Sequence, residues 1–524
     1  MQLRIVATIA IIFLVLFGLY WWGFKTPTRD LNAVSITPTS KPVVLLVIDS
    51  LMDEPLQKAI KEGKAPAFEF FMKHGHYDPE TVSSYPTMSV TIDSTLLTGG
   101  YAEEHKVPGL IWFKEDENRL INYGTGSKEV RKHGVKQVIS DGLIHLNQAH
   151  LSEDVSTIYE ELTSAGLQSA SINGLVHRGD YPHRLNIPKL ASATNLIPRN
   201  LEINGPPLLS LGSLSQYNPE NNQTWRKLGF NDRFTANELR YFMQQDKLPS
   251  FSLAYFPDLD KKVHDNGPSE TNGIEEIDIQ LQSVLNSYKT WDEAIQKAIW
   301  IVYGDSGQNA ILNDRNTSLI KLNLLLEKYR IWNVKEPIDD QDDLVLAVNE
   351  RMAYINLVSE KISFSEIISE LKKEARIGFI AWKENDVNHV VAAGSDEKLT
   401  FSPNGKYTDL YNQSWALNGA GSVLNLTLND QNEILYGDYP DALARLYGAL
   451  NSHEGRFVVV DAKPGYEFIG KHSPTHEGGG GHGSLHKDDS LTPLIIVGTE
   501  VKPQYNRLVD FKDWILELII KQEE

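Results

Sequence analysis

The sequence contains no cysteine among its 524 residues. Disulfides and thiolate metal sites are therefore excluded, and any metal ion must be held by Asp, Glu, His or hydroxyl oxygens. Basic residues are also in deficit, because 50 Lys+Arg stand against 69 Asp+Glu, a net charge of −19. This excess of acidic residues argues against a nucleic acid polymer as a partner, because a surface that binds nucleic acid needs clustered basic residues. A phosphate-bearing ligand would need local positive charge, for instance from metal ions.

Long uncharged apolar runs are lacking except at the N-terminus, where residues 5–24 pass without a charge. A helix of this length spans about 30 Å, the thickness of a bilayer's hydrocarbon core. Aromatic residues at 20–22 suit the membrane interface. We therefore interpret residues 1–24 as an uncleaved transmembrane anchor. The alternative is a cleaved signal peptide, but the apolar run is long for one and no A-x-A-like site follows.

This anchor predicts a single-pass protein of the cell membrane. Arg4 lies on one side of the apolar run, and Lys25 and Arg29 lie on the other, so the positive-inside rule does not decide the orientation. The large domain that follows is expected outside the cytoplasm. Residues 25–41 are polar, contain two prolines and indicate a linker.

After the linker, short apolar runs predict buried strands at 42–49, 251–258, 298–305 and 491–498. Helical patterns lie between them, for example at 152–165 and 272–298. Strands that alternate with helices predict an α/β fold with a doubly wound, mostly parallel central sheet flanked by helices. Ligand sites in such folds lie at the carboxyl ends of the strands.

The region 313–445 has a different pattern, with an acidic patch at 339–343 and a charged helix candidate at 365–378. We interpret it as an inserted α+β cap, which we expect to select the substrate. The catalytic α/β core then consists of two parts, 42–312 and 446–524. The sequence does not predict an oligomeric state.

Acids and histidines gather where the predicted strands meet their loops. They are Asp49, Asp258, Asp260, His264, Asp305, His476, His482 and His486. In a chain without cysteine, Asp and His suit one or two divalent cations such as zinc or manganese. Two such ions could clamp a phosphoryl group and activate a hydroxyl. Taken singly, each residue also has a structural explanation: Asp49 could cap a helix, and the glycines around His482 could form a linker.

The hydroxyl-rich stretch 83–99, "SSYPTMSVTIDSTLLTG", offers three candidate nucleophiles: Thr87, Ser89 and Thr91. Composition alone gives no reason to choose among them. Each could equally be an ordinary buried hydroxyl.

Over residues 43–498 the order and spacing of these segments resemble the alkaline phosphatase superfamily, especially its nucleotide pyrophosphatase/phosphodiesterase branch. Its nucleophile precedes a Thr-Gly pair by nine residues, which points to Ser89, with Thr87 as the runner-up. Its D-x-x-x-H-x-x-G-P segment is matched by residues 260–268. Its Asp-His-Gly and G-x-H-G loops are matched by 305–307 and 480–483.

The resemblance implies an alkaline phosphatase-like fold and two divalent metal ions, with zinc expected. Asp260, His264 and His482 would hold one ion. Asp49, Asp305 and the nucleophile Ser89 would hold the other, through which a covalent phospho-enzyme forms. Ser306 stands where the family has a histidine, so manganese or magnesium is an alternative at this second site. The family's phosphoryl-binding asparagine has no counterpart at the expected place, and Asn122 is a candidate by proximity alone.

The function expected is a membrane-anchored, metal-dependent phosphohydrolase that resembles phosphodiesterases and nucleotide pyrophosphatases and acts on a phosphate ester. A phosphomonoesterase, a phosphonate hydrolase and a phosphoryl-group transferase use the same core and stay open. A non-catalytic surface binding protein on the same fold is the alternative from another class.

Overall fold

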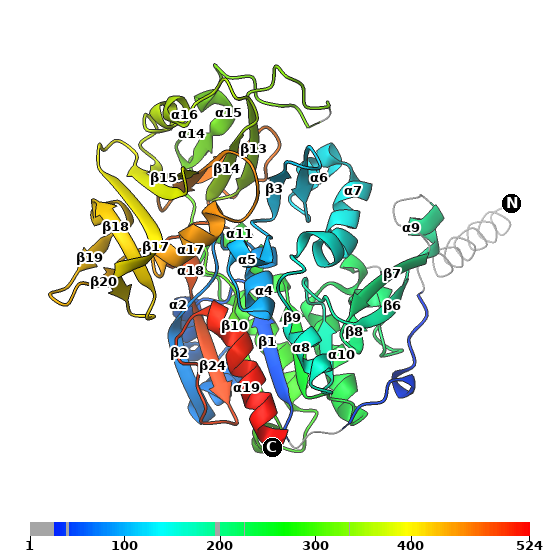
Figure 1. Ribbon diagram of the computed structural model, residues 1–524. Coiled ribbons are helices and arrows are strands. Elements are labelled where there is room, and N and C mark those ends of the chain that lie inside the picture. Colours follow the sequence, from blue (N-terminus) through cyan, green and yellow to red (C-terminus); the bar gives the residue numbers. More distant parts are fainter. Residues whose placement is uncertain (1–25, 38–40, 194–199, 225, 335, 524) are drawn as a thin grey trace, which may run out of the picture.

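A computed structural model describes residues 26–37, 41–193, 200–224, 226–334 and 336–523 of the chain. Two large sheets dominate this part. The central sheet occupies the lower half of Figure 1, and a second sheet lies at its upper left. The predicted anchor, residues 1–24, lies outside the described residues. Among the described helices, none is both long enough and apolar enough to cross a membrane.

Within the described residues, seven strands form the central sheet. In spatial order they are β2 (Gly75–Val82), β24 (Leu491–Val497), β10 (Ile299–Gly304), β1 (Val43–Ile48), β9 (Phe251–Phe256), β5 (Ser169–Ile172) and β8 (Leu208–Ser210). The four predicted strands all form. Neighbours from β10 to β8 pair in parallel, but β24 is antiparallel to both β10 and β2. The sheet is therefore mixed. The prediction of a mostly parallel sheet does not hold at the edge formed by β24 and β2.

The apolar run of β1 is continuous because both of its faces are covered. Val44, Leu46 and Ile48 belong to one core, and Val43, Leu45 and Val47 belong to another. Successive side chains of a strand point to opposite faces, so a strand buried on both faces needs no polar alternation. The first core includes α2 (Asp53–Lys61), α3 (Pro66–His74), α10 (Asp232–Gln244) and α12 (Asn272–Leu285). The second includes α4 (Ser89–Thr98), α8 (Ile158–Ser164) and α19 (Phe511–Glu523), which crosses the front of the sheet in Figure 1.

The helix boundaries correct two sequence expectations. The helix expected at 152–165 begins only at Ile158, because the capping box is formed by Thr157 and Glu160. The helix expected at 272–298 is two helices. The first, α12, ends at Leu285, and α13 (Trp291–Lys297) restarts where the Thr290 side chain accepts a hydrogen bond from the Glu293 N–H.

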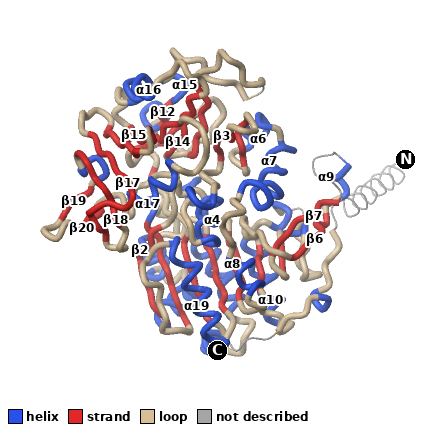
Figure 2. The backbone as a smooth tube through the Cα atoms, in the orientation of Figure 1, coloured by secondary structure: helices blue, strands red, loops and turns tan. Residues whose placement is uncertain are grey.

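In the described part of the chain, nine strands form the second sheet, seen in red at the upper left of the tube in Figure 2. They are β13 (Leu344–Asn349), β14 (Met352–Leu357), β21 (Phe457–Ala462), β15 (Ile377–Glu384), β16 (Val387–Ala392), β17 (Lys398–Asp409), β20 (Glu433–Tyr436), β19 (Leu426–Leu428) and β18 (Ser414–Gly419). Strand β21 follows residue 445, so the sheet extends beyond the predicted cap. The domain boundaries themselves stay a prediction.

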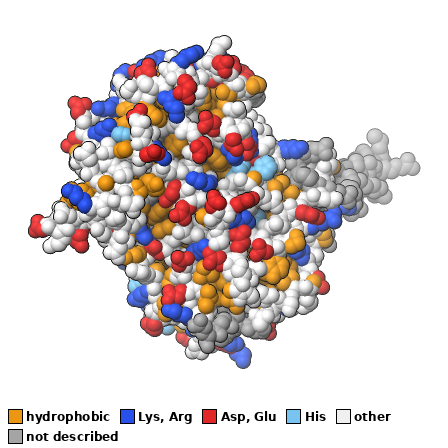
Figure 3. All heavy atoms as spheres, in the orientation of Figure 1, with side chains coloured by type: hydrophobic (Ala, Val, Ile, Leu, Met, Phe, Trp, Pro, Cys, Tyr) orange, Lys and Arg blue, Asp and Glu red, His pale blue; other side chains and the backbone are white. Residues whose placement is uncertain are grey.

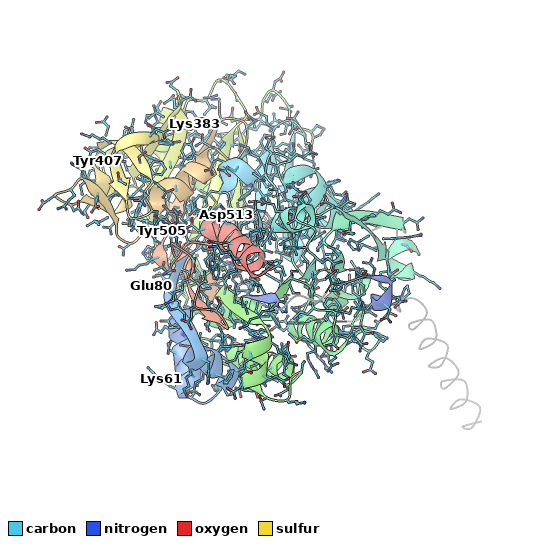
Figure 4. All side chains as sticks on the ribbon, turned by 60° about the horizontal axis from the view of Figure 1, so that its bottom comes forward. Lys61, Glu80, Lys383, Tyr407, Tyr505 and Asp513 are labelled. Atoms are coloured by element: carbon cyan, nitrogen blue, oxygen red, sulfur yellow. The ribbon has the colours of Figure 1, made fainter. Side chains whose placement is uncertain are left out.

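The face drawn in Figure 3 carries both charged and apolar side chains. On the face in Figure 3, acidic side chains are spread among the basic ones. Figure 4 labels side chains from both parts of the molecule, with Lys61 at the end of α2, and Lys383 and Tyr407 on β15 and β17 of the second sheet. This mixed surface agrees with the sequence's excess of acidic residues.

A buried carboxylate joins two helices under the central sheet and gives a test of the fold. Asp278 of α12 accepts hydrogen bonds from the N–H groups of Ala67 and Phe68, at 2.9 and 3.0 Å, in the first turn of α3. We expect Asp278→Ala to lower the free energy of unfolding by about 1–3 kcal/mol, because these buried donors lose their acceptor. Asp278→Asn keeps an acceptor oxygen and should cost less. Urea denaturation measures both.

The same residue predicts a pH dependence. Burial raises the pKa of Asp278 to about 6, although its hydrogen bonds oppose the shift. A carboxyl whose pKa is raised on folding stabilises the fold at low pH, and this contribution is lost as the pH rises through the folded pKa. From pH 4 to pH 7, the wild type should therefore lose stability relative to Asp278→Asn. A constant difference between the two proteins would contradict this role of burial.

Candidate metal centre and active site

The sequence-predicted site residues meet at one edge of the central sheet. Asp49 and Asp305 follow β1 and β10 directly, and α11 (Asp258–Asn266) follows β9. Since β24 runs in the opposite direction, the loop that leads into it reaches the same edge and brings His482 there. A pocket of about 660 Å³ opens at this edge. Its lining includes Asp49, Ser89, Asp260, His264 and His482.

Three of these residues form a compact first group. Asp260 and His264 are four residues apart on α11 and so share one face, with 3.1 Å between Asp260 Oδ1 and His264 Nε2. His482 Nε2 lies 3.8 Å from the same oxygen. His264 Nδ1 donates to the Gly480 carbonyl at 2.8 Å, and His482 Nδ1 donates to the Thr87 carbonyl. Both Nε2 atoms thus face the Asp260 carboxylate, and one oxygen with two imidazole nitrogens is a donor set that suits zinc.

The electrostatics of this group favour a cation. Burial alone would raise the pKa of Asp260, but the neighbouring His264 imidazolium holds it below its usual range. Burial would likewise lower the pKa of His264, yet the charges of Asp260 and Glu350 raise it to about 10. The group thus stabilises positive charge strongly. A bound metal ion replaces protons at such ligands.

The second group consists of oxygen donors. Asp49 accepts a hydrogen bond from the Tyr255 hydroxyl, and Asp305 Oδ1 accepts one from the Ser50 N–H at 2.9 Å. Burial, together with the charge of Asp305, raises the pKa of Asp49 well above its ordinary value, and burial raises the pKa of Asp305 to about 6. Asp305 Oδ2 is buried without a hydrogen-bond partner. An unpaired buried carboxylate oxygen is costly, and a cation ligated there would remove the cost.

Ser50 connects the two groups. Its hydroxyl donates to Asp260 Oδ1 at 3.0 Å and lies 3.5 Å from the Ser306 hydroxyl. Gln308 Nε2 donates to both Ser50 Oγ and Asp260 Oδ1, at 2.8 Å each. The backbone of Ser50 has a φ of 62°, a left-handed conformation that few non-glycine residues adopt. This turn fixes Asp49 and Asp260 relative to each other.

The three candidate hydroxyls have different surroundings. Ser89 is the first residue of α4, is partly exposed and lines the pocket. Thr87 is fully buried, and its hydroxyl accepts a hydrogen bond from the Gly483 N–H at 2.7 Å. Thr91 is buried and donates to the Val107 carbonyl at 3.0 Å. Only Ser89 of these three described hydroxyls faces the pocket, whereas Thr87 supports the His482 loop.

Glu350 is a pocket residue that the sequence did not indicate. It lies in the turn between β13 and β14 with a φ of 55°, so the second sheet contributes to the site. Its carboxylate accepts a hydrogen bond from the His482 N–H at 3.1 Å and lies 3.8 Å from His264 Nε2. The sequence shows only a turn between two apolar strands, and no local signal reveals that the turn reaches this edge of the central sheet.

His476, which the sequence indicates only as a loop residue, lies beside the first group. Its ring stacks on that of His264 with centroids 4.3 Å apart, and its Nδ1 is 2.9 Å from Glu467 Oε2. Asn122, in contrast, uses its side chain in its own turn, where Oδ1 accepts from the Gly124 and Thr125 N–H groups at 2.9 and 3.1 Å. Among the described residues, Gly124 and Thr125 line the pocket in place of Asn122.

A model of the type I phosphodiesterase / nucleotide pyrophosphatase family matches residues 43–485 of the chain. The chain belongs to this family. Its members are metal-dependent phosphoesterases, and this one is a phosphodiesterase/nucleotide pyrophosphatase-like hydrolase of the alkaline phosphatase superfamily. The family uses two metal ions, and the first group above is one of the candidate metal sites in the fold.

Solved structures agree with this fold. Murine ectonucleotide pyrophosphatase/phosphodiesterase 5 matches with a TM-score of 0.55 and 14% identity over 92% of this chain and 95% of that one. The human protein matches with a TM-score of 0.54 and 16% identity, again over 92% of this chain and 95% of the human chain. An inactive variant of the murine protein in complex with AMP has a TM-score of 0.53, 15% identity and the same coverage. A search of curated proteins found no match.

Thr87 provides a test of how the phosphoesterase site is held together. Thr87→Val keeps the shape of the side chain but removes the acceptor of the Gly483 N–H. We expect it to displace the His482 loop and to weaken zinc binding about 10–100-fold, the usual effect of losing a supporting partner of a metal ligand. Thr87→Ser, which keeps the hydroxyl, should bind zinc as the wild type does. Competition with a chromophoric chelator measures both, and equal affinity of Thr87→Val would contradict this role.

Proposed function

We propose that the protein cleaves phosphodiester or pyrophosphate bonds with Ser89 as the nucleophile and two divalent metal ions as cofactors. One observation carries the proposal: Ser89 begins α4 in the same pocket that collects the Asp and His donors. A hydroxyl at this place meets both requirements of the reaction. It is accessible to substrate, and it lies beside groups that can supply positive charge.

Two sets of donor residues support the proposal of two ions. Asp260, His264 and His482 would hold one, and their mixed nitrogen and oxygen donors suit zinc. Asp49, Asp305 and Ser89 would hold the other, for which zinc, manganese and magnesium all remain open. When bound, such ions neutralise phosphoryl charge and lower the pKa of a ligated hydroxyl.

The chain's own residues supply the covalent chemistry. The Ser89 oxygen bonds to phosphorus while the bond to the leaving oxygen breaks, and the serine proton passes to that leaving group. Water then cleaves the bond between the Ser89 oxygen and phosphorus, which restores the Ser89 hydroxyl and releases the other half of the substrate as a phosphomonoester. The N–H groups of Thr91 and Ile92 donate to the Met88 carbonyl, whereas those of Ser89 and Val90, at the start of α4, are placed to donate to phosphoryl oxygens at this end.

The substrate class follows from the family and the pocket. The murine relative was captured with AMP in an inactive form, which supports a nucleotide-containing diester or pyrophosphate here. Leu110, Tyr123 and Phe468 line the same pocket and offer apolar surface to a base or another flat group. The apolar run at 5–24 supports a single membrane anchor, and we propose that the catalytic domain lies outside the cytoplasm.

Turnover by the full chain in detergent tests this function. We expect bis-p-nitrophenyl phosphate to be cleaved faster than p-nitrophenyl phosphate. Dialysis against a chelator should abolish this activity, and zinc or manganese should restore it. A preference for the monoester would favour a phosphomonoesterase instead.

The nucleophile is tested by substitution. Ser89→Ala should lower kcat at least about 10³-fold, as removal of a catalytic nucleophile does, without changing zinc binding at the first group. Thr91→Ala is the matched control, because Thr91 is a hydroxyl of the same helix that faces away from the pocket. Full activity of Ser89→Ala would exclude the assignment.

A further inference from the structure

A second cluster of one acid and two histidines lies outside the candidate active site, on the π-helix η2 (Asp141–His150). Helix α7 (Val135–Ser140), labelled in Figure 1, runs directly into η2. Asp141, His145 and His150 offer ligand atoms that all lie within 4.8 Å of one another. The side chains of Asp141 and His150 are each 1% exposed, whereas that of His145 is 37% exposed. The cluster is therefore enclosed on most sides and reaches solvent at His145.

The π-helix brings the two ends of this cluster together. In an α-helix, with about 3.6 residues per turn, the step from Asp141 to His150 would be about two and a half turns and would place these side chains on opposite sides. A π-helix has wider turns, in which each bond spans five residues, as from the Leu151 N–H to the Leu146 carbonyl at 2.9 Å. The same step is then about two full turns. This rare helix frequently marks a functional site.

His150 carries a ring nitrogen that no described residue satisfies. Its Nδ1 is 2.9 Å from the Tyr123 hydroxyl, but its Nε2 is buried without a hydrogen-bond partner. This Nε2 lies 3.8 Å from Glu117 Oε1, which is too long for a hydrogen bond. His145 Nδ1 lies 2.9 Å from Asp141 Oδ1. A buried, unpartnered imidazole nitrogen beside a second imidazole and carboxylates is placed to ligate a cation.

The charges around the cluster also favour a cation. The Arg119 guanidinium donates to Glu117 at 2.7 Å and to Asp141 at 2.8 and 3.0 Å. One arginine balances only one of these two carboxylates. Lys114 lies 3.7 Å from Glu117, but its ammonium pairs with Asp116 at 2.6 Å. With neutral histidines the cluster therefore keeps about one negative charge, which a metal ion can neutralise.

We propose that Asp141, His145 and His150 bind a zinc ion, with Glu117 as the fourth ligand. Imidazoles and carboxylates are donors that zinc accepts, and four protein ligands make a closed, structural site. The ligands share no residue with the candidate active site, so the inference does not rest on the proposed function.

This zinc ion holds one wall of the active-site pocket. Tyr123 follows β4 (Arg119–Asn122) and lines the pocket together with residues 124–126. Because its hydroxyl contacts His150 Nδ1, an ion that fixes the His150 ring also fixes Tyr123.

Zinc counting on the full chain in detergent tests the site. His145→Ala removes a partly exposed ligand and should leave the fold intact. By elemental analysis it should hold one zinc ion fewer per chain than the wild type. His74→Ala, which replaces an exposed histidine outside the cluster, is the control and should hold as many. Equal zinc content of His145→Ala and the wild type would overturn the proposal and leave the ion pair with Arg119 as the role of Asp141.

A second pair of variants tests the buried ligand. His150→Asn keeps a polar atom near the position of Nδ1 but removes Nε2, so it should also lose one zinc ion. His177→Asn is the matched control, because the Nε2 of His177 is likewise buried and unpartnered but belongs to no metal-binding group among the described residues. Full zinc content of His150→Asn, or an equal loss in His177→Asn, would contradict the assignment.

A variant of the candidate active site separates this proposal from the proposed function. His264→Ala should lose zinc from the first group and keep the ion at η2. If the active site binds no metal, the wild type still holds the η2 zinc, and only the proposed function fails. Zinc should slow the hydrogen exchange of residues 122–126 in His264→Ala but not in His145→Ala/His264→Ala. Equal exchange in the two would contradict the role in the pocket wall.

Discussion

The mutual repulsion of buried carboxylates at one edge of the central sheet is the constraint on which the site depends. Asp49 and Asp305 are enclosed there, and Ser50, which follows Asp49, hydrogen-bonds to both Asp305 and Asp260. Each comes from a different element, so no local interaction explains why they meet. Burial raises the pKa of both enclosed acids. The imidazoles of His264 and His482 lie beside Asp260, at 3.1 and 3.8 Å from its Oδ1. The two enclosed acids call for a cation.

The second sheet also contributes to the site. Its β13–β14 turn brings Glu350 to His264 and His482. The next residue, Arg351, forms a fully buried ion pair with Asp489, which also accepts a hydrogen bond from the Ser484 N–H at 2.9 Å. The turn and the loop that carries His482 are therefore fixed to each other. A sheet that the sequence suggests as a cap also positions a candidate metal ligand.

Much of the central sheet could be predicted from sequence, because strands buried on both faces are continuous apolar runs. The runs of β1, β9, β10 and β24 have this character. Strands β5 and β8 were missed because they are short, and the antiparallel direction of β24 leaves no trace in its composition. Capping side chains such as Thr157 determine where the helices begin. Hydrophobic periodicity alone placed the start of this helix several residues too early.

The candidate site was predictable where strand ends and spacing mark it. Asp49, Ser89, Asp260, His264 and His482 all line one pocket, as their spacing suggested, and Asp305 lies buried beside it. Their roles in catalysis stay proposals. Glu350 was not predictable, because a tertiary contact brings its turn to the pocket.

Anomalous diffraction from crystals of the protein grown with zinc and manganese tests most directly whether cations balance the buried carboxylates. Data collected on both sides of the zinc edge would identify each ion. We expect a zinc peak among Asp260, His264 and His482, and a second anomalous peak among Asp49, Ser89 and Asp305. A map with no anomalous peak at this edge of the sheet would contradict the account.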